Sequence, residues 1–401
     1  MALTILLIGK FAPTCGQVST LNLWLCVGLA RRGYRVIVCS DSNFKQKQLV
    51  SFGDCGNVSS FLDELGLTST VLYSSYLADE VFFPFSDLSF TSMLSSANEI
   101  VENHKPDILI TSYLEPYALV GHILSIEYDI PHIATHAGTD AVRLCGIPRV
   151  EALYKRLLPR TTRFIPKTVK AAALASDTGG PTPSPYYPPA DRFRFNANDW
   201  RLSLAIPDQI KEMAHEEPVF GYYGKFTHGK SLLEIVQAFS EYRRRHSSGF
   251  LWLVGGNVSS SLDIYDLIES CGVRNCSLVT HFLPNWHIPD VINACTAMFY
   301  MKSNYNVTEH NSIVVREIVA CGCPVIVTNE SIQGSHRSAD CNPLLINVHN
   351  HTDIEQIIDA MRKSLGIQRC EQAKDVELNA SRHEQYVASW ETIINAAGEK
   401  R

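Results

Sequence analysis

The stretch EHNSIVVREIVACGCPVIVT, Glu309–Thr328, carries two carboxylates, Glu309 and Glu317, that are separated by seven residues. Apolar residues at helical spacing begin between these two glutamates, and Asn311 or Ser312 is suited to cap the predicted helix. The first turn would offer free N–H groups and the positive end of a helix dipole to an anion such as a diphosphate. Glu317 lies farther along, where its carboxylate can accept hydrogen bonds from sugar hydroxyls.

A Cys-Gly-Cys-Pro break follows this helix and leads into the apolar strand Pro324–Thr328. The stretch resembles the glutamate-seven-glutamate motif of the family-4 retaining glycosyltransferases, which have the GT-B fold. The positions that match the motif are Glu309, Glu317, Ala320, Gly322, Pro324 and Val325. Taken alone, two glutamates at this spacing also fit an ordinary surface helix, but the Gly-x-Pro-Val strand behind them favours the motif.

The composition is that of a globular protein of two ordinary domains, because the chain has 401 residues and 45% of them are apolar. A net charge of −6 argues against a protein that coats nucleic acid. The N-terminus lacks a basic signal region, and no apolar run is long enough to span a bilayer. Twelve scattered cysteines without paired CxxC motifs indicate reduced thiols, so a cytoplasmic protein is expected.

The chain opens with a strand, a glycine loop, a helix and a second strand, which predicts an α/β fold with a doubly wound sheet. The Gly-x-Gly-x-x-Gly fingerprint of dinucleotide sites is absent, which disfavours an NAD-binding fold. The helix expected over Leu21–Arg32 and the strand after it resemble the opening of the glycosyltransferase family. Of the glycine pair that precedes this helix in the family, only Gly16 is present, and Gln17 takes the second place. The resemblance makes Gly16 a candidate donor-binding residue.

A polar cluster, His136-Ala137-Gly138-Thr139-Asp140, follows the predicted strand Pro131–Thr135. Open α/β sheets bind ligands at the carboxyl ends of their strands. The cluster also resembles a His-Gly-Thr-Asp stretch in which the family's histidine faces the donor sugar, which makes His136 a candidate catalytic residue. The plain alternative is a histidine in a turn.

Five prolines and two glycines make Asp177–Ala190 a stiff segment, which indicates a domain boundary. We therefore expect an N-terminal Rossmann-like acceptor domain over residues 1–185 and a C-terminal Rossmann-like nucleotide-sugar donor domain over 186–375. The family resemblance, which includes Ser389-Trp390, predicts that a last helix over 376–401 crosses back to the N-terminal domain.

The segment GKFTHGKS, Gly224–Ser231, fits two motifs at once. It reads as the Gly-x4-Gly-Lys-Ser loop of P-loop NTPases, and it also resembles the family's Gly-Arg-x4-Lys-Gly stretch. In the second interpretation Lys225 stands in place of the arginine, Lys230 in the lysine position, and Ser231 in place of the second glycine. Both interpretations bind a diphosphate, but no later strand ends in the carboxylate that a P-loop needs for magnesium. The glycosyltransferase interpretation is therefore favoured.

The resemblance implies a hexosyltransferase that retains the anomeric configuration of a UDP- or GDP-linked sugar and passes the sugar to an unknown acceptor. It implies catalytic roles for Glu309 and His136. The donor-binding residues that it implies are Gly16, Lys225, Lys230, Asn311, Ser312, Ile313 and Glu317. The sequence has no Asp-x-Asp, so neither a metal nor another cofactor is expected. A homodimer is compatible with the resemblance.

Two enzymatic alternatives stay open at this point. One is a sugar-nucleotide epimerase or hydrolase of the same fold, and the other is a P-loop-type NTPase. A phosphorylase would need a lysine for pyridoxal phosphate, and no motif for one is present. A binding module without activity would leave the glutamate and lysine motifs without a role.

Overall fold

The structure is a computed structural model, and it describes residues 3–399 apart from several internal segments. The internal segments outside the description are 42–54, 68–69, 76–87, 137–139, 142–145, 167–168, 175–198, 258–262, 304–312, 333–342 and 370–375. The predicted boundary segment Asp177–Ala190 therefore lies outside the described residues. The chain divides into two compact units, one of Met1–Tyr186 with Glu384–Arg401 and the other of Tyr187–His383.

Unit 1 is built on a six-stranded parallel sheet with the strand order β3-β2-β1-β4-β5-β6. Its strands are β1 (Thr4–Gly9), β2 (Arg35–Asp41), β3 (Val71–Ser75), β4 (Ile108–Ser112), β5 (His132–Thr135) and β6 (Arg163–Ile165). The central strand β1 is buried over its last five residues, as expected for a parallel sheet that is covered on both faces. The doubly wound sheet predicted from the opening of the sequence is confirmed.

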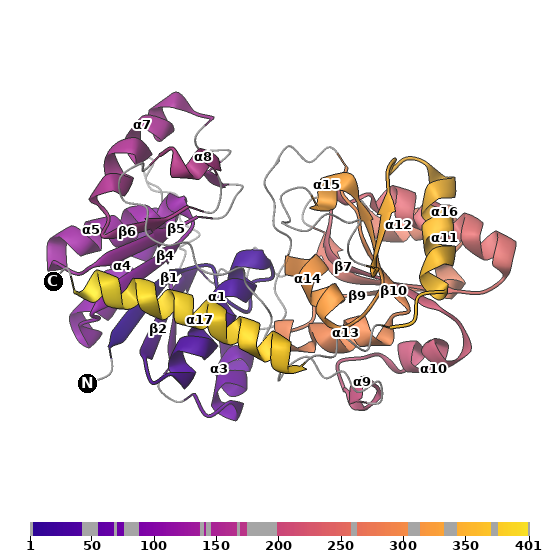
Figure 1. Ribbon diagram of the computed structural model, residues 1–401, viewed down its shortest axis with the longest axis horizontal. Helices are drawn as coiled ribbons and strands as arrows, with labels where there is room; N and C mark the ends of the chain where they lie inside the picture. The colour runs from indigo at the N-terminus through magenta and orange to yellow at the C-terminus, as the bar shows by residue number, and fades with distance from the viewer. Residues whose placement is uncertain are drawn as a thin grey trace. The chain divides into compact units, whose positions relative to one another are not determined.

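Helices of unit 1 lie on both faces of this sheet (Figure 1). They are α1 (Gln17–Arg31), α3 (Cys55–Glu64), α4 (Leu88–His104), η2 (Leu114–Ala118), α5 (Leu119–Tyr128), α7 (Pro148–Leu157), η3 (Leu158–Arg160), α8 (Val169–Ala172) and the end of α17 (Val376–Gly398). One face packs on α4 and α5, where Leu6 and Ile8 of β1 meet Met93 and Val120. Helix α1 starts at Gln17, four residues before the predicted start, so Gly16 caps the helix directly.

Unit 2 repeats the architecture with a parallel sheet of order β12-β11-β10-β7-β8-β9. Its strands are β7 (Val219–Phe226), β8 (Phe250–Asn257), β9 (Ser277–Thr280), β10 (Ala297–Tyr300), β11 (Val325–Thr328) and β12 (Leu345–Val348). Successive residues of β7 enter different cores, because Val219 packs with Trp252 on one face and Phe220 packs with Phe239 on the other.

The helices of unit 2 separate onto these two faces. They are α9 (Asp199–Leu202), α10 (Asp208–Glu216), η5 (His228–Lys230), α11 (Leu232–His246), α12 (Ile264–Ser270), η6 (Arg274–Cys276), η7 (Asn285–His287), α13 (Ile288–Ala294), α14 (Ile313–Ala320), α15 (Asn329–Ile332) and α16 (Ile354–Leu365). Helices α11, α12 and α16 cover one face, and α10, α13 and α14 cover the other. No helix within the described part of the chain combines the length and the apolar character that crossing a membrane requires.

The predicted loop Gly224–Ser231 is shorter than expected, because β7 continues to Phe226. The extension pairs with β8, and Gly224 lies opposite Gly255. A Cβ atom at Gly255 would lie 1.9 Å from the carbonyl oxygen of Gly224, so only glycine permits this approach of the two backbones. The prediction of a loop at Gly224–Phe226 was therefore wrong, and Lys225 is a strand residue.

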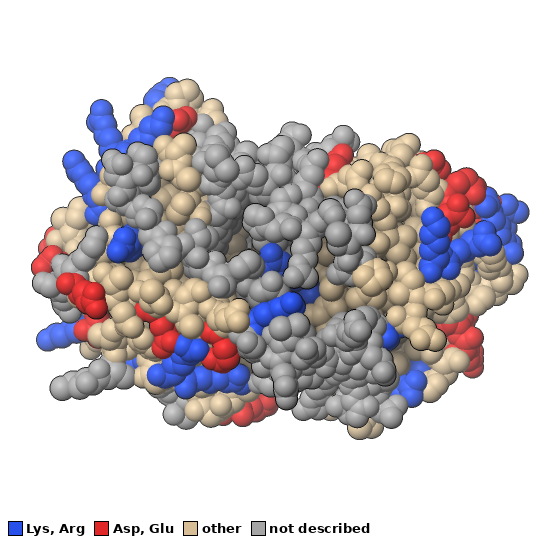
Figure 2. Space-filling model, in the orientation of Figure 1, with Lys and Arg blue, Asp and Glu red and all other residues tan. Residues whose placement is uncertain are grey.

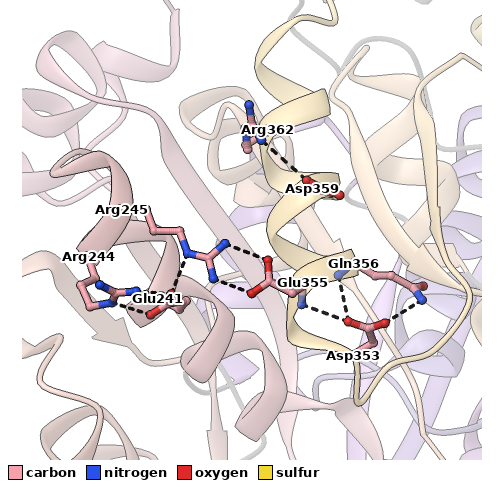
Figure 3. A network of polar contacts seen from close by, with 8 residues as sticks. All are labelled: Glu241, Arg244, Arg245, Asp353, Glu355, Gln356, Asp359 and Arg362. Carbon is pink, nitrogen blue, oxygen red and sulfur yellow. Dashed lines mark hydrogen bonds and ion pairs between the residues drawn. The ribbon is translucent and has the colours of Figure 1, made fainter.

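An ion-pair network on the surface joins α11 to α16 (Figure 3). Arg245 bridges Glu241 and Glu355, and Arg244 donates to Glu241 over 2.7 Å. Asp353 caps α16 by accepting from the N–H of Glu355. Figure 2 shows acidic and basic side chains intermixed over these helices. Because Arg244 and Arg245 already have carboxylate partners, and because exposed pairs contribute little to stability, we assign this surface no binding role.

The end of α17 packs against α1 within unit 1, where Gly28 of α1 faces Val387. A Cβ atom at Gly28 would come within 2.4 Å of the Val387 Cγ2 atom. At the end of the same contact, Arg32 forms ion pairs with Glu384 and Glu391. The close approach of the two helices therefore depends on the absence of a side chain at Gly28.

We predict that Gly28→Ala destabilises unit 1 by about 1–2 kcal/mol, because overpacking outweighs the better helix propensity of alanine. Val387→Ala should partly rescue the variant, which gives a coupling free energy of about 0.5–3 kcal/mol in a double-mutant cycle of chemical denaturation. Gly398→Ala is the matched control, because nothing lies within 4 Å of a Cβ atom there. Additive effects of the two substitutions would contradict this account of the contact.

Candidate functional site

The glutamate-seven-glutamate stretch forms α14 followed by β11, as predicted. Helix α14 starts at Ile313, directly after the two residues expected to cap it. Glu309, Asn311 and Ser312 lie outside the described residues, so the structure does not place them. Ile313 and Glu317 are both buried in α14.

Glu317 is 7% exposed, and burial raises the pKa of its carboxyl group to about 8. Among the described residues, none donates a hydrogen bond to this carboxyl group. A buried carboxyl group with unused acceptor capacity favours a ligand that brings hydroxyl groups to it.

Lys225 and Lys230 lie on either side of the turn that connects β7 to α11. The Lys230 ammonium group is 5.1 Å from the centroid of the Tyr300 ring. Burial and the charge of Lys225 lower the pKa of Lys230 to about 8. On the strand side, the Tyr222 hydroxyl donates to the carbonyl oxygen of Lys225 over 2.8 Å and fixes the backbone there.

A third lysine, Lys302, belongs to the same group, and sequence reasoning did not select it. It lies two residues after the end of β10 and is fully buried, and its ammonium group lies 5.3 Å from the centroid of the same Tyr300 ring. Burial, with the charge of Lys230 as a second cause, lowers the pKa of Lys302 to about 6. The only signal in the sequence is a lysine at the end of an apolar strand, one residue before Ser303.

The sheet order brings these lysines to one edge. Strands β7 and β10 are neighbours and run parallel, so their carboxyl ends meet at the same side of the sheet. The N–H of Ser303 donates to the carbonyl oxygen of Gly229 over 3.3 Å, which ties the end of β10 to the turn that carries Lys230. Lys230 and Lys302 thus lie over the Tyr300 ring, and the charge of Lys225 acts on Lys230. We call these three residues the lysine cluster (Lys225, Lys230 and Lys302).

Ser231 is the N-cap residue of α11, and its backbone conformation is unusual for a serine. Its φ is 50°, in the left-handed region that favours glycine, and its hydroxyl group is buried. That hydroxyl group has no hydrogen-bond partner within the described part of the chain. Because β7 ends only at Phe226, the segment left between strand and helix is shorter than the P-loop interpretation requires.

In unit 1, Gly16 and His136 each lie beside the carboxyl end of the sheet. Gly16 is exposed and has a φ of 144°, a conformation that favours glycine. His136 is buried, its ring centroid is 5.9 Å from that of Phe164, and its Nδ1 atom lies 3.6 Å from Asp140 Oδ1. Ala137–Thr139 between them lies outside the described residues.

Asp140 is the second site residue that sequence reasoning did not single out. Its carboxylate accepts hydrogen bonds from the N–H groups of Leu114 and Ala141, at 2.8 and 2.7 Å. Two backbone donors hold the carboxylate in place, so it can orient the nearby His136 ring. The aspartate stood in the quoted sequence cluster, but its contact with Leu114 depends on strand order.

Within the residues that the structure describes, no group of three or more His, Cys, Asp or Glu side chains is placed to hold a metal ion.

Two family models match the chain and together cover most of it. The model described as "Glycosyl transferases group 1" matches residues 207–380, and the model described as "Glycosyl transferase 4-like" matches residues 11–168. The chain is a family-4-like glycosyltransferase. It is an enzyme that depends on a nucleotide sugar. A comparison with curated proteins gave no match.

Solved structures similar to the glycosyltransferase confirm the predicted GT-B fold. Sucrose-phosphate synthase from Thermosynechococcus elongatus has a TM-score of 0.64 at 15% identity, over 99% of this chain and 97% of that one. Anabaena Alr3699/HepE in complex with UDP-glucose has a TM-score of 0.62 at 15% identity, over 98% of both chains. WaaG, a glycosyltransferase involved in lipopolysaccharide biosynthesis, has a TM-score of 0.64 at 16% identity, over 97% of this chain and 98% of that one.

The family match decides between the two interpretations of Gly224–Ser231. The segment lies inside the matched range 207–380, and the structure shows that β7 takes up its first three residues. The P-loop alternative is therefore wrong, and the lysines of this segment belong to a glycosyltransferase domain.

We predict that Glu317→Gln stabilises the unliganded glycosyltransferase, and that the gain grows as the pH rises from about 5 to 8. The folded carboxyl group keeps its proton up to about pH 8, whereas the unfolded one loses it near pH 4.5. Rising pH therefore favours the unfolded wild type, by an amount on the order of a few kcal/mol, and the neutral glutamine removes this effect.

Thermal melting of both proteins across this pH range measures the effect. Glu212→Gln is the matched control, because Glu212 is exposed on a helix of the same unit. A difference in melting temperature that stays constant with pH would show that the Glu317 carboxyl group is ionised in the folded protein.

Proposed function

We propose that the protein is a retaining glycosyltransferase that moves a hexosyl group from a nucleotide-diphosphate sugar to an acceptor nucleophile without a metal ion. The observation that supports this most directly is the placement of Lys225 and Lys230 at the carboxyl edge of the second sheet. In open α/β sheets this edge is where ligands bind, and ammonium groups there attract a diphosphate.

In the proposed reaction the bond between the anomeric carbon and the diphosphate breaks while the acceptor oxygen approaches from the same face of the sugar. The acceptor hydroxyl proton passes to the departing diphosphate oxygen, and the new glycosidic bond keeps the original anomeric configuration. Positive charge develops on the sugar ring and negative charge on the diphosphate. The two ammonium groups oppose the second, so catalysis rests on stabilising the leaving group and on positioning.

The family resemblance suggests the other donor contacts. Glu317 would accept hydrogen bonds from the ribose hydroxyls, a role for which its buried carboxyl group has the acceptor capacity. Glu309 would contact the sugar hydroxyls, and the backbone N–H groups of Asn311–Ile313 would lie nearby. In unit 1, His136 would line the sugar site with its ring oriented by Asp140.

The donor is proposed to carry UDP or GDP. Structures of Anabaena Alr3699/HepE hold UDP with glucose and UDP-glucose, which supports a uridine nucleotide here by similarity of fold. The alternative of an epimerase or hydrolase of the same fold predicts turnover of the donor without an acceptor. No feature of the described residues favours that alternative over transfer.

We predict that Lys230→Ala weakens the binding of UDP or GDP about 10- to 100-fold, because a charge-assisted contact contributes about 1.5–3 kcal/mol. Isothermal titration calorimetry, run in excess EDTA, measures the affinity. Lys363→Ala is the matched control, because Lys363 is an exposed lysine of the same unit. Unchanged affinity in Lys230→Ala would remove the donor-site assignment, and wild-type binding that requires added manganese or magnesium would overturn the metal-free proposal.

A further inference from the structure

The outer side of α7 and of the η3 turn behind it carries basic and apolar side chains together. Five exposed residues at helical spacing form this side, which we call the basic–apolar face: Arg149, Ala152, Leu153, Arg156 and Arg160. The opposite side of α7 packs into the core of unit 1. The basic–apolar face is therefore presented to solvent, although the helix that carries it is anchored in the domain.

The arginines of this face have no partner in the described part of the chain. No hydrogen bond or ion pair there involves the guanidinium group of Arg149, Arg156 or Arg160. Glu151, the acidic residue of α7, lies beside the face and pairs with Lys155 over 2.7 Å. The arginines of α11 in Figure 3, by contrast, bind carboxylates. No described carboxylate therefore neutralises the charge of the basic–apolar face.

The surrounding sequence concentrates positive charge at this place. Residues 147–170 contain seven Lys or Arg residues and one acidic residue, whereas the whole chain has a net charge of −6. Figure 2 shows basic side chains that project from the part of unit 1 where Figure 1 has α7, with few acidic ones between them. A local excess of basic residues in an acidic protein gives this face a positive potential, which attracts an anionic surface.

Apolar side chains project among these charges. Leu153 is 44% exposed in the middle of the face, and Ile147, which directly precedes the helix, is 51% exposed. The face has no aromatic residue on which a nucleic-acid base could stack. The interfacial layer of a bilayer accepts projecting apolar side chains, and anionic headgroups attract the basic residues around them.

The size of the face distinguishes a bilayer from a protein partner. Helix α7 has 10 residues and is therefore about 15 Å long and about 10 Å wide. A stable protein complex buries about 800 Å² on each partner, which is far more than the outer side of one such helix offers. A bilayer needs no matching shape, because its headgroups rearrange around the side chains that approach them.

We propose that the basic–apolar face docks unit 1 on the surface of an anionic lipid bilayer. The three guanidinium groups bind lipid phosphate groups, and the side chains of Leu153 and Ile147 enter the headgroup layer. The proposal does not rest on the proposed function, because it uses neither the lysine cluster nor any other candidate site residue.

The experiment is co-sedimentation of the full chain with lipid vesicles in the absence of nucleotide. One set of vesicles is phosphatidylcholine alone, and in the other about a third of the lipid is phosphatidylglycerol. The charge variant replaces the three arginines of the face by glutamine. Its matched control removes the same charge from three exposed arginines of unit 2: Arg244→Gln, Arg274→Gln and Arg362→Gln.

A second pair of variants tests the apolar contribution. The apolar variant is Ile147→Gln with Leu153→Gln. Its matched control is Leu202→Gln with Leu365→Gln, because these leucines of unit 2 are also exposed. All of the substituted side chains are exposed, so the melting temperature is expected to change little.

We expect wild type and both controls to bind the anionic vesicles and not those of phosphatidylcholine alone. Binding should weaken at about 1 M salt, where the Debye length is about 3 Å. Each arginine near an anionic surface changes partitioning about fivefold, so the charge variant should partition about 100-fold more weakly than its control. The apolar variant should partition about 10-fold more weakly than its own control.

Several results would overturn the proposal. They are a wild type that does not bind the anionic vesicles, and a charge variant or an apolar variant that binds them as tightly as its control. Retention on immobilised polyglutamate without binding to the vesicles would assign the face to an acidic protein instead.

If the charge variant does not fold, amide hydrogen exchange of the wild type on anionic vesicles decides. Slowed exchange over residues 148–160 would support the proposal, and unchanged exchange there would overturn it. None of these measurements involves a nucleotide, so their failure would leave the proposed function as it stands.

Discussion

An ammonium group that is removed from water loses favourable hydration. It is compensated by an anion or by hydrogen bonds, or it gives up its proton. This constraint applies to the lysines of the second unit. Lys230 and Lys302 meet it at one ring, Tyr300, with their pKa values lowered to about 8 and about 6. In the proposed function, a diphosphate would supply an anion to these ammonium groups. The same groups would then oppose the negative charge that the proposed reaction leaves on the diphosphate.

The scaffold around these groups consists of contacts that allow little adjustment. Gly224 and Gly255 bring β7 and β8 close enough to extend the strand into the lysine segment. Thr328 links the backbone at the end of β10 to β11. In the first unit, two N–H groups hold Asp140 beside His136. Each contact lies at the carboxyl end of a strand, which is the edge of an open α/β sheet where ligands are expected.

Much of this fold follows from the sequence, because parallel strands buried on both faces give continuous apolar runs. The strand predicted at Pro324–Thr328 is β11, which begins one residue later, and the helix predicted to be capped by Asn311 or Ser312 begins at Ile313. The elements that were not predicted include α7 and α10, whose apolar residues are few and interrupted by charges. The sequence analysis placed the end of β7 before Gly224, because Gly224 and Gly229 are typical of a turn. The pairing of Gly224 with Gly255 of β8, which extends the strand, depends on the fold.

The candidate site was predictable where residue type and motif agree, as for Lys230 and Glu317. Lys302 was not predictable, because lysine at a strand end is ordinarily a solvated residue. Its burial follows from the place of β10 between β7 and β11, which is a property of sheet order. Asp140 was missed for a similar reason, since its backbone donor at Leu114 comes from a distant part of the chain.

The most direct measurement of the central claim, that the second unit binds the nucleotide diphosphate at the lysine cluster, is amide hydrogen exchange with and without UDP or GDP. The account predicts that the nucleotide slows exchange over residues 225–233, at residues 301–303 and in the first turn of α14, because bound ligand suppresses local opening. Slowed exchange that is confined to the first unit, or to the surface of α11 and α16, would contradict it.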